Sequence, residues 1–295
     1  MHNLTEFESV AGGRSRQLTR VLKLGISAVF VAIVTTGRAL LRLAGKVPPA
    51  TCIILYYHSI PLEQRDAFAR QLEIVARLTT PVNIEDLPTF LPGVRYSALT
   101  FDDAFEDAVE NAVPELVKRK VPAVIFVTTD VLGQPAAWWP PSAPERSRRI
   151  ATAEQLHQLP SQWIGIGAHA KTHPRLSSLN EADARREIAE PRHTLEAMLG
   201  RKVDFFSFPY GDFNEQAVQL CREAGYTKVF TTQNRNAFHD REEFLVGRVC
   251  AEPTDWKLEF RLKLLGGYLW MPRAVVLKRK LLALPVVSRL RSRLA

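Results

Sequence analysis

The chain has 295 residues, of which 46 % are hydrophobic and 24 % are charged, a composition typical of a globular protein with one or two domains. It excludes a disordered chain, a collagen and a protein with many membrane spans. The three cysteines, Cys52, Cys221 and Cys250, are widely separated, which excludes a disulfide framework and a cysteine-based zinc site.

The net charge of +8 is distributed unevenly along the chain. Residues 1–50 carry seven basic and two acidic side chains, and residues 256–295 carry ten basic and one acidic. The central residues 51–255 therefore have a net charge of −6, which argues against a nucleic-acid-binding surface on the folded part. Basic termini interspersed with leucine are typical of segments that bind an anionic membrane surface, here that of a bacterial-type inner membrane.

The N-terminal region holds 14 uncharged residues, Leu24 to Gly37, which as a helix would be about 21 Å long, against a hydrocarbon core of about 30 Å. On a helical wheel the flanking basic residues share one sector of about 140°; they are Arg16, Arg20, Lys23, Arg38, Arg42 and Lys46. We expect one helix from Arg16 to Lys46. A single membrane span, an interfacial or re-entrant helix and a plain buried helix remain open, whereas the small-residue cleavage site of a signal peptide is missing.

From residue 51 short apolar runs alternate with helical stretches. The predicted strands are 51–60, 96–101, 122–128, 162–168, 202–208, 226–231 and 244–250, and the predicted helices are 67–78, a stretch through 108–117, 180–199 with a kink or split at Pro191, and 214–224. This alternation predicts a parallel sheet, either closed as a barrel or open.

Three polar clusters directly follow predicted strands. They are Thr100-Phe101-Asp102-Asp103, the His169-x-x-x-His173-Pro174 spacing, and Phe206-Ser207-Phe208-Pro209-Tyr210-Gly211. In a parallel α/β fold the loops at the carboxyl ends of the strands gather into one site. Each cluster alone has an ordinary structural explanation, such as a helix cap or a turn, but their joint occurrence at strand ends favours a functional site.

With these motifs the chain resembles the polysaccharide deacetylase family, also called the NodB-homology or carbohydrate esterase family 4 domain, from about Ile53 to Val249. The run Ile54-Leu55-Tyr56-Tyr57-His58-Ser59-Ile60 resembles the branch that includes poly-N-acetylglucosamine deacetylases. The resemblance implies a distorted (β/α) barrel of about seven parallel strands, with basic amphipathic or membrane-associated helices at both termini. The expected divisions are 1–50, 51–255 for the deacetylase domain, and 256–295.

The resemblance also implies roles for individual residues. Asp103, His169 and His173 would bind one divalent metal ion, zinc first and nickel or cobalt as alternatives. Two imidazoles and one carboxylate leave open positions for water and substrate, as a catalytic metal site requires. The metal would activate its water and polarise the amide carbonyl, Asp102 would be the general base, and the backbone N–H of Tyr210 would help to stabilise the oxyanion.

The sequence departs from the family pattern at three places. Ala104 follows Asp-Asp where many members have Gly, a change that a helical backbone would tolerate. Ser207 stands where many members have the arginine that orients the base, and we expect Arg248 to take its place beside Asp102. The late histidine motif is absent, since the only later histidine is His239 in a polar stretch; His58 is therefore the candidate general acid.

The two remaining segments of interest allow alternatives. Trp138 and Trp139 either stack on sugar rings or pack their loop onto the barrel rim. Residues 256–295, interrupted at Pro272 and Pro285, form basic amphipathic helices that either dock on anionic lipid or pack back onto the barrel.

The predicted function is metal-dependent removal of N-acetyl groups from an amino sugar of a polysaccharide or lipid-linked glycan. The alternatives are a non-catalytic glycan-binding member and a hydrolase of O-acetyl or formyl groups.

Overall fold

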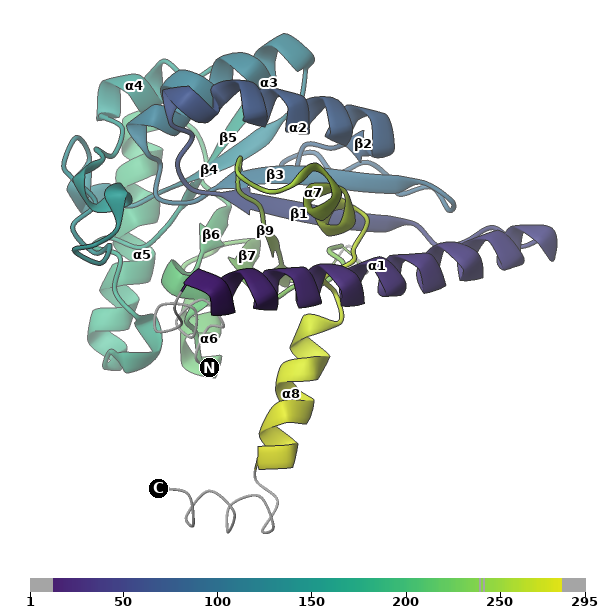
Figure 1. Ribbon diagram of the computed structural model, residues 1–295. Coiled ribbons are helices and arrows are strands. Elements are labelled where there is room, and N and C mark those ends of the chain that lie inside the picture. Colours follow the sequence, from purple (N-terminus) through teal and green to yellow (C-terminus); the bar gives the residue numbers. More distant parts are fainter. Residues whose placement is uncertain (1–12, 239, 241, 283–295) are drawn as a thin grey trace.

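The computed structural model describes residues 13–238, 240 and 242–282 (Figure 1). His239 and residues 283–295, with Pro285 and the last three arginines of the predicted tail, lie outside the described residues, as does the side chain of Arg16.

Seven parallel strands form a closed, distorted barrel, as predicted. Six of them are β1 (Thr51–Tyr57), β3 (Arg95–Phe101), β4 (Ala123–Val127), β5 (Ile164–Ala168), β6 (Phe205–Ser207) and β7 (Lys228–Thr231). The seventh is interrupted: β8 (Leu245–Gly247) pairs with β7, and β9 (Val249–Cys250) pairs with β1. The single residue between these two segments is Arg248, so the strand that closes the barrel is broken at that residue.

The barrel is distorted in two further ways. β5 and β6 share only the pair Ala168–Phe206, whereas β1 and β3 pair over seven residues. A short strand that the sequence pattern did not predict, β2 (Thr80–Pro81), adds to β3 outside the ring.

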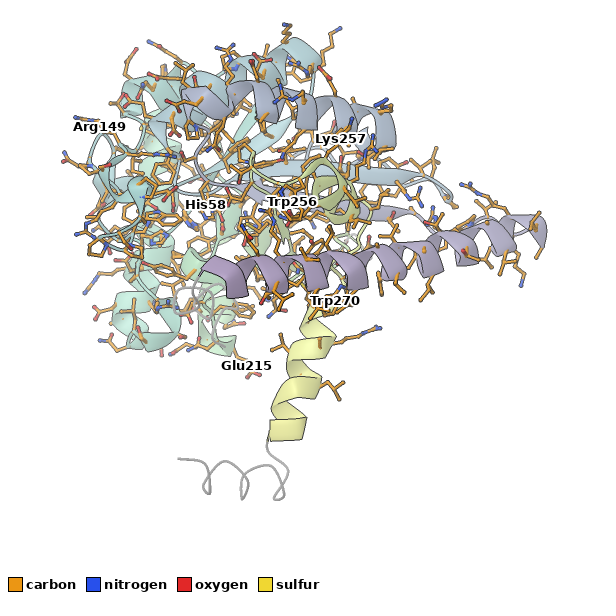
Figure 2. All side chains as sticks on the ribbon, viewed as in Figure 1. His58, Arg149, Glu215, Trp256, Lys257 and Trp270 are labelled. Carbon is orange, nitrogen blue, oxygen red and sulfur yellow. The ribbon has the colours of Figure 1, made fainter. Side chains whose placement is uncertain are left out.

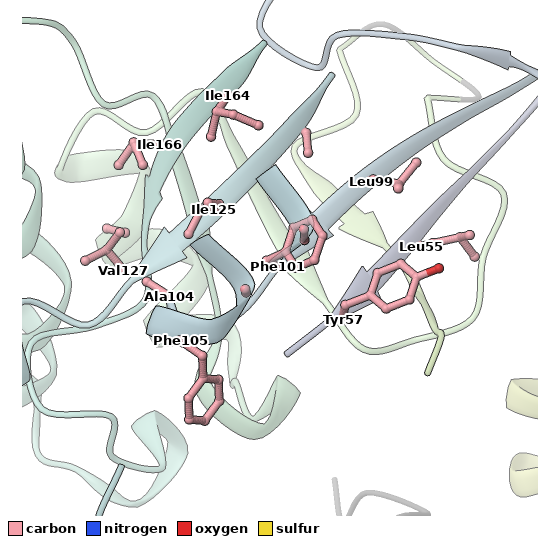
Figure 3. Close-up of a cluster of buried hydrophobic side chains, with 14 of the residues drawn as sticks. Leu55, Tyr57, Leu99, Phe101, Ala104, Phe105, Ile125, Val127, Ile164 and Ile166 are labelled. Carbon is pink, nitrogen blue, oxygen red and sulfur yellow. The ribbon is translucent and has the colours of Figure 1, made fainter. Parts of the chain in front are cut away.

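Helices cover the outside of the barrel (Figure 1). They are α1 (Gly13–Leu43), α2 (Arg65–Leu78), α3 (Val113–Arg119), α4 (Ala153–His157), α5 (Glu181–Leu199), α6 (Glu215–Glu223) and α7 (Lys257–Leu264). One further helix, α8 (Met271–Leu282), projects away from the barrel (Figure 1). Figure 3 shows part of the apolar layer between strands and helices, to which the strands contribute alternate residues such as Leu55, Leu99 and Ile125. Burying this layer is the main stabilising contribution to the fold.

The other strand face points into the barrel. On β1 and β3 the inward residues include Cys52, Ile54, Tyr96 and Ala98, which form a separate buried cluster. Because side chains alternate along a strand, the inward row of β3 continues to Thr100 near the end of the strand and to Asp102 just after it, and the inward row of β1 continues to His58. The alternation therefore places these polar residues at the carboxyl end of the barrel interior.

Two predicted helices differ in detail. α5 is continuous through the buried Pro191, so the predicted split does not occur; the helix packs against β5 and α6. The helix predicted through residues 108–117 begins with a π-helical turn, Ala108–Ala112, before α3. Such turns are frequent near functional sites.

The terminal segments contact the barrel. α7 contacts both α1 and α2, and Phe260, Leu262 and Leu264 of α7 are buried. The first part of the predicted tail therefore packs back onto the fold, and α8 begins at Met271, next to the predicted break at Pro272. The division of the chain at residues 50 and 255 stays a prediction.

Candidate active site

The predicted site residues meet in one cleft at the carboxyl ends of the strands. The cleft has a volume of about 500 Å³, and its lining includes His58, Asp102, Asp103, His169, His173 and Tyr210. These six residues span 152 positions of the sequence, from His58 to Tyr210. They line the same space because they follow four strands, β1, β3, β5 and β6, of one parallel barrel.

Asp103, His169 and His173 form a compact group of three potential metal ligands. All three are buried, and their ligand atoms lie within 4.8 Å of one another. Oδ1 of Asp103 lies 3.1 Å from Nε2 of His173 and 3.4 Å from Nε2 of His169. The group projects one carboxylate oxygen and two imidazole nitrogens toward a common point.

The hydrogen bonding of this group fits a bound cation. Nδ1 of His169 lies 2.8 Å from the carbonyl oxygen of Ser207; because a carbonyl oxygen only accepts, Nδ1 carries the hydrogen and Nε2 of the neutral ring keeps its lone pair. Oδ1 of Asp103 is buried and accepts no hydrogen bond from the described residues. A buried carboxylate oxygen and two imidazole nitrogens that face one another are stabilised by a positive charge between them, so the residues present fit a divalent metal.

Asp102, the neighbour of Asp103, has a different partner. The guanidinium of Arg248 contacts both carboxylate oxygens, with Nη1–Oδ1 and Nη2–Oδ2 distances of 2.7 and 2.8 Å. Arg248 is completely buried. Burial alone would raise the pKa of the Asp102 carboxyl, but the charge of Arg248 and, to a smaller extent, His169 holds that pKa below its ordinary value, so the carboxylate is ionised at neutral pH.

Ser207 leaves space for Arg248 beside Asp102 and bonds to both residues. Its hydroxyl accepts a 2.7 Å hydrogen bond from Nη2 of Arg248 and donates a 3.3 Å bond to Oδ1 of Asp102. Thr100, two residues before Asp102 on the same inward row, accepts from Nη1 of Arg248. The small side chain at position 207 leaves room for an arginine from the closing strand, whose guanidinium also packs against the ring of Tyr56 at 4.8 Å.

The two tryptophans of the β4–β5 loop contact the candidate metal ligands. Nε1 of Trp139 donates a 3.2 Å hydrogen bond to Oδ2 of Asp103, and the ring of Trp138 stacks on that of His173 at 4.5 Å. Both are partly buried against the core, so the loop packs onto the rim, while both rings also line the cleft. No sequence pattern indicates the Trp139–Asp103 contact, whereas the alternation of inward residues along β3 could have indicated Thr100.

His58 and Tyr210 lie on two other sides of the cleft. The ring of His58 packs edge-on against Trp139 at 5.4 Å. The ring of Tyr210 lies 4.6 Å from that of His173, and Arg175 covers it at 4.5 Å. The catalytic roles of His58, Tyr210, Asp102 and Arg248 stay predictions.

The backbone of the site is strained. Five non-glycine residues here have positive φ angles: Asp103 (71°), Ala104 (57°), Ala170 (62°), His173 (65°) and Tyr210 (58°). We expect alanine at position 104 to be tolerated if the backbone there is helical; the backbone is instead in the left-handed region, where glycine is favoured over alanine. Each such residue costs about 1–3 kcal/mol and is typical of functional sites, where the surrounding fold enforces the conformation.

Comparison with known proteins agrees with this geometry. The family model for polysaccharide deacetylase matches residues 92–229, a range that holds all three motifs but neither His58 nor Arg248. YxkH, a polysaccharide deacetylase homologue of Bacillus subtilis (strain 168), is 26 % identical over 216 residues, which cover 70 % of this chain and 73 % of that protein.

Solved structures show the same fold. IcaB from Ammonifex degensii is 22 % identical, with a TM-score of 0.60 over 74 % of this chain and 98 % of that chain. The deacetylase PplD of Streptococcus pyogenes is 20 % identical, with a TM-score of 0.58 over 70 % of this chain and 94 % of that chain.

Residues 92–229 match the polysaccharide deacetylase family model, and the motifs and the barrel are similar to those of the NodB-homology domains of carbohydrate esterase family 4. The chain is an enzyme of the deacetylase class, whose members use a divalent metal, and it carries an Asp-His-His group suited to one.

Proposed function

We propose that this enzyme hydrolyses the N-acetyl amide of an amino sugar in a polysaccharide or lipid-linked glycan and releases acetate. One observation carries the proposal. Two adjacent carboxylates, Asp102 and Asp103, face the same cleft with different partners, an arginine for the first and two histidines for the second. This division suits one carboxylate to proton transfer and the other to metal binding.

The metal held by Asp103, His169 and His173 is proposed to be zinc, with nickel or cobalt as alternatives, since two nitrogens and one oxygen suit these ions. When bound, it would supply Lewis-acid polarisation of the acetyl carbonyl and lower the pKa of the attacking water. The hydrogen bond from His169 Nδ1 to Ser207 orients one imidazole, and Trp139 orients the carboxylate.

Asp102 is the proposed general base. Its ionised carboxylate can accept a proton from the attacking water, and the two-point contact with Arg248 fixes the plane of the carboxylate. Arg248 is a positioning residue in this scheme, because it acts through Asp102 from inside the barrel.

His58 is the proposed general acid and the backbone N–H of Tyr210 the proposed oxyanion donor. His58 lies at the end of β1 and lines the cleft together with Asp102, where it can protonate the leaving amine of the sugar. The left-handed conformation of Tyr210 orients the peptide groups of the turn after β6, as an oxyanion donor requires.

Acetate release from N-acetylglucosamine oligomers tests the proposal. The full chain would be assayed after metal removal, after addition of zinc, nickel or cobalt, and as Asp102→Asn. Asp86→Asn, an exposed aspartate near the opposite end of the barrel, is the matched control, and circular dichroism checks that each variant is folded. We expect metal-dependent release that Asp102→Asn abolishes and Asp86→Asn retains.

Other outcomes would overturn parts of the scheme. If the enzyme bound metal tightly and hydrolysed O-acetyl or formyl sugars but not these oligomers, the bond that it cleaves would be an ester or a formamide rather than the proposed N-acetyl amide. Binding of oligomers without hydrolysis of any of these substrates would indicate a glycan-binding member. Failure to bind metal would refute the mechanism.

A further inference from the structure

Helix α1 is attached to the folded domain along most of its length. Near its start, Nε of Arg20 donates a 2.8 Å hydrogen bond to Oε2 of Glu259 on α7, and its guanidinium covers the ring of Trp256 at 4.3 Å. In the middle, the indole of Trp270 donates to the hydroxyl of Ser27 over 3.0 Å. Figure 2 shows Trp256 and Trp270 close to α1.

The attachment continues to the end of the helix. Leu24, Ala28 and Val31 pack against the core of the domain. Arg38, almost completely buried, donates to the backbone oxygens of Pro49 and Gly93 at 2.8 and 3.1 Å. Contacts from residue 20 to residue 38 span about 27 Å of helix at 1.5 Å per residue.

The opposite face of α1 is apolar and exposed. At 100° per residue, the charged residues between positions 18 and 43 all fall toward the domain-facing side, which leaves the outer face without charge. Six large side chains on this outer face are 59–84 % exposed: Leu18, Leu22, Val29, Ile33, Leu40 and Leu43. They extend over about 38 Å, and a continuous apolar surface of this size marks an interaction site.

We infer that α1 lies in the plane of one membrane leaflet, with this outer face in an anionic lipid bilayer, and that it does not cross the membrane. By length and composition residues 17–43 could also span a bilayer. A spanning α1, however, would have to leave the domain, or bring the Arg20–Glu259 ion pair and Arg38 into hydrocarbon, and both cost free energy. An in-plane helix keeps every contact and buries only its uncharged face.

Charge complementarity selects lipid as the occupant. The helices on this side of the barrel, α1, α7 and α8, belong to the two basic segments of the sequence, residues 1–50 and 256–295, while residues 51–255 carry a net charge of −6. Arg20 and Arg38 are bound to the domain, but Arg42 and Lys46, at and just after the end of α1, are exposed, and exposed basic side chains beside an apolar helix face are attracted to anionic headgroups.

The inferred orientation brings the membrane close to the catalytic cleft. A second cavity, about 470 Å³ in volume, is lined by Gln17, Arg20 and Lys23 of α1 and shares Cys250 and Glu252 with the cleft. If the proposed deacetylase function holds, on which this step rests, glycans at the bilayer surface are the substrates that the enzyme reaches first.

Sedimentation with vesicles tests the surface. The full chain would be mixed with vesicles of phosphatidylethanolamine and phosphatidylglycerol, and the bound fraction compared for wild type, Val29→Asp/Ile33→Asp and the control Leu62→Asp/Ala76→Asp. The two control residues are exposed and lie just before and on α2, which Figure 1 shows away from α1. We expect at least a tenfold weaker binding for the α1 variant only, while acetate release from soluble oligomers is unchanged.

Equal sedimentation of all three proteins would overturn the inference. The inference would also be overturned if the wild-type chain did not bind vesicles but formed a dimer, and Val29→Asp/Ile33→Asp dissociated that dimer. The outer face of α1 would then bind a second copy of the chain. Since vesicle binding is measured without substrate, its failure is distinguishable from failure of the proposed function.

The depth of α1 in the bilayer separates the in-plane from the spanning arrangement. A fluorophore would be attached to Leu22→Cys, Ile33→Cys or Leu40→Cys, each in a chain that also carries Cys52→Ala, Cys221→Ala and Cys250→Ala, and quenched by lipids brominated at known depths. We expect the same shallow depth at all three positions. A deep position 33 between shallow positions 22 and 40 would indicate a spanning helix and overturn the inference.

Discussion

The indole nitrogen of Trp139 lies 3.2 Å from Oδ2 of Asp103, on the carboxylate oxygen that does not face the two histidines. The other oxygen, Oδ1, points at His169 and His173. The hydrogen bond therefore fixes which carboxylate oxygen is available to a metal. Partners of this kind typically change metal affinity 10–100-fold.

Replacing Trp139 with phenylalanine should weaken metal binding. Trp139→Phe keeps the aromatic packing but removes the donor to Asp103, and we expect about a tenfold higher Kd for zinc, measured by competition with a chromogenic chelator. Trp138→Phe is the matched control, because phenylalanine can still stack on His173 and the Kd should stay within about twofold. Equal Kd values for Trp139→Phe and wild type would contradict the prediction.

The buried Arg248–Asp102 pair should behave as one unit in stability. Arg248→Met leaves the Asp102 carboxylate buried without its cation, and we expect a loss of about 3–5 kcal/mol in the free energy of unfolding, measured in urea. The double variant Asp102→Asn/Arg248→Met removes both charges and should recover part of that loss. Additive effects of the two single changes would show that the pair is not coupled.

His58→Ala tests the general acid through the shape of the pH profile. Loss of the acid should lower kcat about 10²–10⁴-fold and remove the alkaline limb of the kcat profile. His157→Ala, on α4 outside the cleft, is the control and should change neither. A His58→Ala profile that keeps its alkaline limb would rule out the role.

Glu115 should make stability depend on pH in the acid range. This buried carboxyl is bonded to Arg65 and Arg119; burial raises its pKa, but the two guanidinium groups outweigh that effect and the pKa lies below its ordinary value. Because the folded-state pKa is depressed, the stabilisation is present above the ordinary glutamate pKa of 4.5 and is lost as the pH falls through the folded value.

Urea unfolding at pH 7 and pH 3 measures this effect. Glu115→Gln should lower the unfolding midpoint at pH 7 and have a smaller effect at pH 3. The exposed Glu110→Gln should change neither midpoint. A Glu115→Gln effect of the same size at both pH values would contradict the assignment.

The strands and the three motifs could be predicted from sequence because both depend on local patterns. Alternation of buried residues locates strands such as β1, and parallel topology then brings Asp103 and His169 together. The contact of Arg248 with Asp102 could also be predicted. Ser207 stands where many family members have the arginine that orients the base, which points to another arginine beside Asp102. These inferences need only the order of elements and the chemistry of their ends.

The remaining features depend on loop conformation and docking, which no periodicity encodes. Nothing in the sequence indicates that Trp139 turns its indole toward Asp103, or that Ala104 is held in a left-handed conformation. The sequence does not indicate which side of α1 faces the barrel. Its basic side chains could bind lipid headgroups, but in the structure Arg20 binds Glu259 and Arg38 binds the backbone oxygen of Gly93.

The break in the closing strand ties the environment of Asp102 to completion of the ring. Asp103, His169 and His173 all precede residue 248 in the chain, and Arg248 lies between β8 and β9, the two segments that complete the ring. A chain truncated before residue 248 would therefore contain all three candidate metal ligands but lack the arginine that pairs with Asp102.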